Sequence, residues 1–151
     1  MIELTFAEIA KVTGGTLAGL NPQDTTTATP VIDSRKVMSG TFFVALPGER
    51  VDGNDFCGQA IEAGADFVIC TVPMSLPSIL VEDSLIAVTA LAQHARARME
   101  ATTFIALTGS QGKTTTKDLI NSVLSTKAET FSPVGSFNNE IGVPLSILSC
   151  T

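Results

Sequence analysis

The segment Thr108-Gly-Ser-Gln-Gly-Lys-Thr-Thr115 decides the fold class of this chain. The apolar run Thr103-Phe-Ile-Ala-Leu107 precedes it and predicts a β-strand, and the pattern that follows predicts a helix over residues 113–124. A strand, a glycine-bearing turn, Lys-Thr and a helix form the layout of a phosphate-binding loop, because turn amides and the positive end of the helix dipole converge on an anion. The segment therefore predicts an α/β protein that binds ATP or GTP.

The residue types of this loop suit the binding of a nucleotide. Lys113 is expected to place its charge against the outer phosphates, and Thr114 to offer its hydroxyl to Mg²⁺. The spacing is unusual, because Leu107 occupies the position of the first glycine and Gly109 gives Gly-x-x-Gly-Lys-Thr instead. The alternative is a glycine-rich turn of an ordinary α/β domain with Lys113 in solvent. The residues expected to bind the nucleotide are Gly109, Ser110, Gln111, Gly112, Lys113, Thr114 and Thr115.

Composition excludes several classes of protein. The 151 residues are 44% hydrophobic, which is enough to bury a core, and the net charge of −6 argues against nucleic acid as a partner. Three cysteines without metal-like spacing and a single His94 offer no zinc site, so we expect idle thiols and a surface or boundary histidine. The sequence shows neither a signal peptide nor a membrane-spanning apolar run. We therefore expect a cytoplasmic monomer.

Two parts differ along the chain. Residues 1–82 read as a small mixed α/β domain, with a Thr5/Glu8 capping box before a helix at 6–12, strands at 16–20, 31–32, 41–46, 67–71 and 78–81, a loop at 21–30 and a helix at 55–63. Residues 83–151 read as the start of a Rossmann-like, parallel-sheet ATPase domain, with helices at 84–100, 113–124 and from 145, and strands at 103–107 and 130–134. Such a sheet normally has five or six strands, so we expect this second domain to be incomplete.

Polar segments at other strand ends are further candidates for a site. Asp33-Ser-Arg-Lys36 and the loop Pro47 to Gly53 each follow a strand, where α/β domains place ligands, although both also read as surface turns. Arg35 has the fork geometry to bind a phosphate or a carboxylate. Asn138-Asn139-Glu140 follows the phosphate loop by one βα step. These Asn side chains either orient phosphate, metal-bound water or substrate, or cap a helix.

These segments together resemble the Mur ligase family, the ATP-dependent amide ligases of peptidoglycan precursor synthesis. The resemblance rests on Asp33-Ser-Arg-Lys36, on Ser39 to Phe56 and on the Thr-Gly-x-x-Gly-Lys-Thr loop, which also accounts for the absent first glycine. It implies that Ser34, Arg35 and the Asp52-Gly53 loop hold a uridine nucleotide. Asn138-Asn139 points to the member that adds D-alanyl-D-alanine to UDP-MurNAc-tripeptide. The alternatives are the tripeptide synthetase of this family and a non-catalytic nucleotide-binding module.

The resemblance implies a reaction in which ATP phosphorylates the terminal carboxylate of UDP-MurNAc-tripeptide. The amino group of D-alanyl-D-alanine then attacks the acyl phosphate, and phosphate leaves. The catalytic set that the resemblance implies is Lys113 together with Asn138 and Asn139, which would border the reaction centre. The resemblance also implies that Thr114 is the Mg²⁺ ligand. The family also needs a downstream acidic metal ligand, a His and a Lys that cannot be identified here. We therefore expect these 151 residues alone not to ligate.

Overall fold

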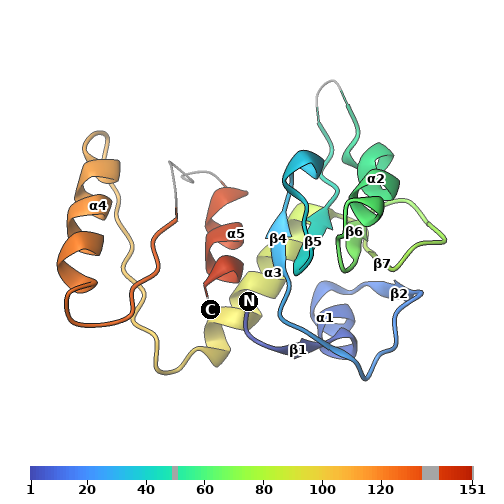
Figure 1. Cartoon of the computed structure of the whole chain (residues 1–151), viewed down its shortest axis with the longest axis horizontal. Helices are drawn as coiled ribbons and strands as arrows, with labels where there is room; N and C mark the ends of the chain where they lie inside the picture. The colour runs from blue at the N-terminus through green and yellow to red at the C-terminus, as the bar shows by residue number, and fades with distance from the viewer. Residues whose placement is uncertain (49–50, 134–139, 151) are drawn as a thin grey trace.

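The structure is a computed structural model that describes residues 1–48, 51–133 and 140–150. It is a mixed α/β fold, as the sequence predicts (Figure 1). Its elements in chain order are β1 (Leu4–Thr5), α1 (Phe6–Thr13), β2 (Thr16–Ala18), β3 (Thr25–Thr26), β4 (Thr29–Val31), the 3-10 helix η1 (Ser34–Lys36), β5 (Thr41–Val44), the 3-10 helix η2 (Gly53–Phe56), α2 (Cys57–Glu62), β6 (Val68–Cys70), β7 (Ser78–Leu80), α3 (Ser84–Arg98), α4 (Lys113–Leu124) and α5 (Gly142–Ser149).

The main sheet of the described residues has five strands in the order β2-β7-β6-β5-β4. The four strands from β4 to β7 are parallel, and β2 joins β7 antiparallel at one edge. A separate antiparallel pair joins β1 to β3. The predicted loop at 21–30 is wrong where β3 and the start of β4 lie, because β-branched threonines there complete strand pairs.

Alternate residues of the strands face two different cores. Phe42 and Phe67 lie on one face, where their rings stack with centroids 4.7 Å apart, and Phe6 of α1 meets Phe67 edge-on. Phe43 and Cys70 lie on the other face, under α2. Both faces are covered by helices, so the central strands are apolar at every position rather than at alternate ones.

Helix α1 begins where the sequence predicts. Thr5 is the N-cap, its hydroxyl accepts a hydrogen bond from the Glu8 amide at 3.1 Å, and the Glu8 carboxylate accepts one from the Thr5 amide at 2.9 Å. The hydrogen bond from the Thr5 amide, followed by one that the Thr5 hydroxyl donates to the same carboxylate at 3.0 Å, lowers the pKa of Glu8. Glu8 also forms an ion pair with Arg98 at 3.1 Å, which joins α1 to the end of α3. The capping box is therefore confirmed, and it also contributes to a tertiary contact.

Helices α3 and α5 pack together on the same face of the sheet as α1. The stripe predicted for α3 is largely right, since Val88, Leu91, Ala92 and Ala95 are buried, while Leu85 and Met99 are half-buried. Helix α5 begins at Gly142, three residues before the predicted start, because Pro144 is tolerated in the first turn of a helix. Leu145 and Leu148 of α5 lie in the same core as the strands. The domain boundary at residue 82 stays a prediction.

Helix α4 stands apart from the rest of the molecule (Figure 1, orange). Its bounds match the prediction, but none of its described side chains is buried. The strands predicted at 103–107 and 130–134 are wrong over 103–107 and 130–133, which form no strand among the described residues. A strand exists only through pairing with a neighbour, and the described chain places none beside these segments.

Candidate functional site

The carboxyl ends of β4, β5 and β6 meet at one edge of the main sheet, because these strands are parallel neighbours. Helix η1 follows β4, the loop to η2 follows β5, and Thr71 follows β6. The four residues predicted to hold a uridine nucleotide, Ser34, Arg35, Asp52 and Gly53, therefore lie on two neighbouring segments of this edge. Open α/β sheets bind their ligands at such an edge.

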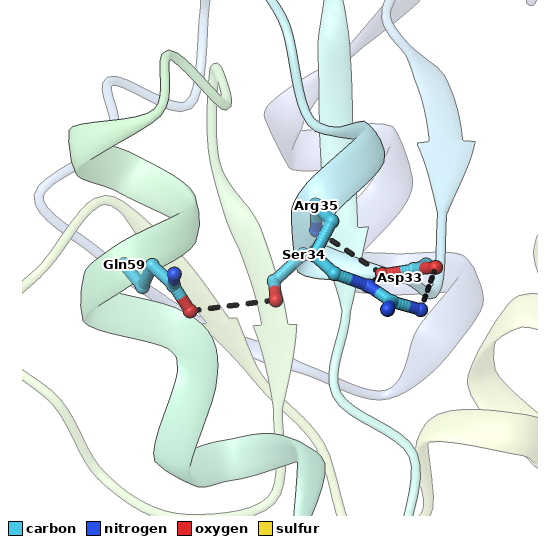
Figure 2. Close-up of polar contacts among 4 residues, drawn as sticks. All are labelled: Asp33, Ser34, Arg35 and Gln59. Carbon is cyan, nitrogen blue, oxygen red and sulfur yellow. Dashed lines mark hydrogen bonds and ion pairs between the residues drawn. The ribbon is translucent and has the colours of Figure 1, made fainter.

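Asp33 and Arg35 form a forked ion pair at the start of η1 (Figure 2). Arg35 Nε donates to Asp33 Oδ1 at 2.9 Å, and Nη2 donates to Oδ2 at 2.8 Å. The hydrogen bond from the Arg35 side chain, followed by that from its backbone amide, lowers the pKa of Asp33 to about 2. The Arg35 side chain is still 83% exposed, so its orientation is fixed while most of its surface faces solvent. An oriented, exposed guanidinium suits an anionic ligand.

Ser34 points from η1 toward α2 (Figure 2). Its hydroxyl donates to Gln59 Oε1 at 3.4 Å, which joins the segment after β4 to the helix after the β5 loop. Gln59 was not among the predicted site residues. Nothing in the sequence marks it, because only the packing of η1 against α2 brings it near Ser34.

The Asp52-Gly53 loop is held close to the end of β5. Asp52 caps η2 by accepting from the Asn54 amide at 2.9 Å, and the Gly53 amide donates to the Leu46 carbonyl at 3.0 Å. A Cβ on Gly53 would lie 2.6 Å from the backbone N and O of Leu46, a distance that real side chains do not show. Position 53 therefore requires glycine for reasons of space. Asp52 and Gly53 therefore determine the shape of the loop, Asp52 through its hydrogen bond to the Asn54 amide and Gly53 through its close approach to Leu46.

Asn54 is a second residue of this edge that sequence reasoning missed. It is only 8% exposed, and its amide nitrogen donates to Asp52 Oδ1 at 2.7 Å and to the Thr71 hydroxyl at 2.9 Å. Its carbonyl oxygen accepts from the Thr71 amide at 3.0 Å. The available signal was that Asn54 directly follows Asp52-Gly53, while its burial, which requires hydrogen-bond partners for the amide, follows only from the fold. Asn54 fixes the β5 loop to the end of β6.

The predicted phosphate loop leads into α4 through two glycines of positive φ. Gly112 is the N-cap in the left-handed region (φ 79°), and Gly109 also has a positive φ of 153°. Because the N-cap is a glycine, it has no side chain with which to cap the first amides of α4. Lys113 Nζ donates to the Gly109 carbonyl, so its charge lies over the loop. Residues 108–112 are exposed, and Thr114 lies in the first turn of α4.

The predicted site residues fall into two separate groups. One group lies at the carboxyl edge of the sheet, and the other lies at the start of α4. In the view of Figure 1 both groups, together with the start of α5, lie toward the upper end of the molecule. Asn138 and Asn139 lie outside the described residues. Within the described part of the chain, no cluster of three or more His, Cys, Asp or Glu side chains is placed to hold a metal ion.

This fold places the predicted site residues in an α/β protein at the ends of parallel strands and at a glycine turn into a helix, and comparison with known families gives the class. Residues 31–107 match the model of the Mur ligase family, catalytic domain, and residues 107–151 match the Mur ligase middle domain. The chain belongs to the Mur ligase family. The two models meet at Leu107, directly before the phosphate loop.

Two similar relatives carry the same name. The chain is 40% identical to the UDP-N-acetylmuramoyl-tripeptide–D-alanyl-D-alanine ligase of Mycobacterium tuberculosis, over 100% of this chain and 35% of the relative. It is 41% identical to the ligase of the same name from Bacillus subtilis, over 99% of this chain and 34% of the relative. The chain thus spans about a third of the length of the curated relatives that it matches.

Solved structures agree with this assignment. MurF from Acinetobacter baumannii matches 97% of this chain and 33% of its own, with a TM-score of 0.83 and 34% identity. The MurF ligase from Thermotoga maritima in complex with ADP matches 83% of this chain and 30% of its own, with a TM-score of 0.68 and 38% identity.

Proposed function

We propose that this chain carries the uridine-nucleotide site and the ATP-phosphate site of a ligase that adds D-alanyl-D-alanine to UDP-MurNAc-tripeptide in peptidoglycan precursor synthesis. The observation that carries the proposal is the glycine turn into α4, with Gly112 as N-cap and Lys113 folded over the loop, in a chain that is similar to ligases of this name. The substrates come from those relatives and are proposed for this chain. We propose the cytoplasm as its location, and no helix among the described residues is long and apolar enough to cross a membrane.

The residues at the start of α4 fit a bound triphosphate. The amides of residues 110–115 and the helix dipole would hold the phosphate oxygens, and Lys113 would move from the Gly109 carbonyl to a phosphate oxygen. A phosphate oxygen is also the stronger acceptor for Lys113, because a hydrogen bond between two charged groups is stronger than one to a neutral carbonyl. When bound, ATP supplies the phosphoryl group that activates the terminal carboxylate of the tripeptide.

Thr114 is the proposed ligand of Mg²⁺. A single hydroxyl fits this ion, because Mg²⁺ in phosphate sites keeps several waters and takes few protein ligands besides the phosphates. Asn138 and Asn139 are proposed to border the reaction centre, since the segment that carries them joins the phosphate-loop unit to α5.

The carboxyl edge of the sheet is proposed to hold the uridine nucleotide. Arg35 presents an exposed guanidinium whose direction is already fixed by its hydrogen bonds to Asp33. Binding of a diphosphate would therefore cost little additional side-chain entropy. Ser34, which bonds to Gln59 of α2, and the Asp52-Gly53 loop, which leads into α2, are proposed to line the rest of the site.

Substitution of Lys113 tests the ATP site. Titration of the chain with Mg·ATP in a calorimeter should show binding that weakens about tenfold or more in Lys113→Ala, because a charge-assisted bond contributes about 1.5–3 kcal/mol. Lys127→Ala removes a more exposed lysine beyond the end of α4 and should bind as the unsubstituted chain does. Equal binding by the two variants, or no binding by the unsubstituted chain, would contradict the assignment. The same chain with all three substrates should form no product.

A further inference from the structure

The hydrogen bonds of Asn54 fix the direction of the Thr71 hydroxyl. The Thr71 backbone amide can only donate, so it must face the carbonyl oxygen of the Asn54 side chain, which it meets at 3.0 Å. The Asn54 amide nitrogen therefore faces the Thr71 hydroxyl and donates to it at 2.9 Å. Because the hydroxyl oxygen accepts this bond, its own proton is directed away from Asn54 and can be donated to another acceptor.

Asp52 is held beside Thr71 by the same asparagine. The Asn54 amide nitrogen also donates to Asp52 Oδ1 at 2.7 Å, and the Asn54 backbone amide donates to this oxygen at 2.9 Å. Among the residues that the structure describes, none donates to Asp52 Oδ2, and none accepts the Thr71 hydroxyl proton. Asp52 and Thr71 thus offer one acceptor and one donor side by side, and we name them the Asp52–Thr71 pair.

The Asp52–Thr71 pair lies at the carboxyl edge of the sheet. Asp52 is exposed in the loop after β5, and Thr71 is half-buried directly after β6. The residues that adjoin them in the sequence, Val51 and Val72, are apolar and yet 52% and 47% exposed. Polar groups with exposed apolar neighbours suit a ligand that combines hydroxyl groups with a ring, as a nucleoside does.

The chemistry of the Asp52–Thr71 pair selects hydroxyl groups rather than phosphate. A carboxylate only accepts hydrogen bonds and repels a phosphate, whereas a hydroxyl of the ligand can donate to Asp52 and accept from Thr71. Carboxylates bind ribose hydroxyls in this way in dinucleotide-binding α/β proteins. We propose that the Asp52–Thr71 pair binds the 2′- and 3′-hydroxyls of the ribose of the uridine nucleotide.

This inference rests on the uridine site proposed above and gives the bound nucleotide a direction. The ribose would lie at the ends of β5 and β6, and the diphosphate at Arg35 beyond the end of the neighbouring strand β4. It also assigns Thr71 as a further binding residue and Asn54 as the positioning residue that orients it.

Binding of UDP and of its two deoxy analogues tests the proposal. In calorimetric titrations, the 151-residue chain should bind 2′-deoxy-UDP and 3′-deoxy-UDP about tenfold or more weakly than UDP, because each analogue leaves one polar group of the pair without its partner. Binding of none of the three would contradict the uridine site and the ribose contact together. Equal binding of all three would contradict the ribose contact and leave the uridine site standing.

Variants of Thr71 show whether its hydroxyl makes the contact. In Thr71→Val the preference for UDP over one deoxy analogue should disappear, whereas Thr71→Ser keeps the hydroxyl and should keep the preference. Thr102→Val removes an exposed threonine hydroxyl beyond the end of α3 and should change nothing. Partial unfolding of a variant does not alter the result, because it weakens the apparent affinity for every ligand by the same factor.

Asp52→Asn tests the other member of the pair without changing its size. The oxygen of the new amide must stay at the Oδ1 position to accept from Asn54, so a donor replaces Oδ2. The preference for UDP over the other deoxy analogue should then disappear. The proposal is wrong if Thr71→Val and Asp52→Asn both keep the full preference, or if they weaken the binding of all three ligands equally.

Discussion

The side chain of Asn54 is hydrogen-bonded at both ends to Thr71, seventeen residues further along the chain. Its amide nitrogen donates to the Thr71 hydroxyl at 2.9 Å, and its carbonyl oxygen accepts from the Thr71 amide at 3.0 Å. This pair of bonds joins the segment after β5 to the residue after β6. The shape of the proposed uridine site therefore depends on a residue that need not contact the ligand.

Replacing Asn54 should loosen this edge of the sheet. Asn54→Ala leaves the Thr71 amide without its partner, which should lower the free energy of unfolding by about 1–3 kcal/mol in urea titrations. Binding of a uridine diphosphate sugar should weaken as well, because the Asp52-Gly53 loop loses its anchor. Asp55→Ala, at the exposed neighbouring position, should change neither quantity by comparison. A stable Asn54→Ala variant with normal binding would show that the Asn54–Thr71 pair has no positioning role.

Asp33 should stay ionised in acid where ordinary carboxylates do not. Its pKa is lowered to about 2, against about 3.9 for a free aspartate. The stabilisation from this ion pair is therefore fully present above about pH 4, and it is lost as the pH falls toward about 2. Carboxyl ¹³C shifts should show no titration of Asp33 down to pH 3.

Two substitutions separate the causes of this low pKa. Arg35→Ala removes its largest cause and should raise the Asp33 pKa toward the ordinary value. Lys36→Ala removes only a weaker, more distant charge and should move the pKa much less. An Asp33 carboxyl that titrates alike in both variants would mean that the forked ion pair is absent in solution.

Leu148 should be as important to stability as a residue of the sheet itself. It is fully buried in the core shared by α3, α5 and the strands. Leu148→Ala should lower the free energy of unfolding by about 2–5 kcal/mol in urea titrations, because it leaves a cavity. Val143→Ala, at a 53% exposed position of α5, should cost far less. Similar values for the two variants would mean that α5 does not dock as described.

The thiols should differ in reactivity. Cys57 and Cys70 are buried, and burial raises the pKa of Cys57 to about 12 and also raises that of Cys70. Cys150 is partly exposed. At pH 8, Ellman's reagent should label one thiol per folded chain and three in urea, because the thiolate is the reacting form. Rapid labelling of more than one thiol in the folded chain would contradict the burial of the other two.

Local signals in the sequence were sufficient for much of the fold. The Thr5/Glu8 capping box located the start of α1, and Gly112-Lys113 located the start of α4, since both depend on residues within one turn. Period and apolar content identified the central strands. The Asp33-Ser-Arg-Lys36 segment was correctly placed at a strand end because parallel strands bring their carboxyl ends to one edge.

Contacts between residues far apart in the sequence could not be predicted from it. Residues 103–107 have the composition of a strand, but the described chain gives them no neighbour to pair with. The bonds from Asn54 to Thr71 and from Ser34 to Gln59 exist only because separate segments meet in the fold. Helix α5 contacts β4 and α3, and the spacing of apolar residues in this short helix does not predict which elements it contacts.

The return of α5 to the first core has a consequence for the order of events during synthesis. The sheet and α3 are complete in sequence at Arg98, yet the core that they form also requires Leu145 and Leu148. At roughly 5–20 residues per second, residues 99–148 take about 3–10 s to be made. During that interval the surface of α3 and β4 that α5 covers in the fold stays open, so we expect a nascent chain paused between the phosphate loop and α5 to bind chaperones.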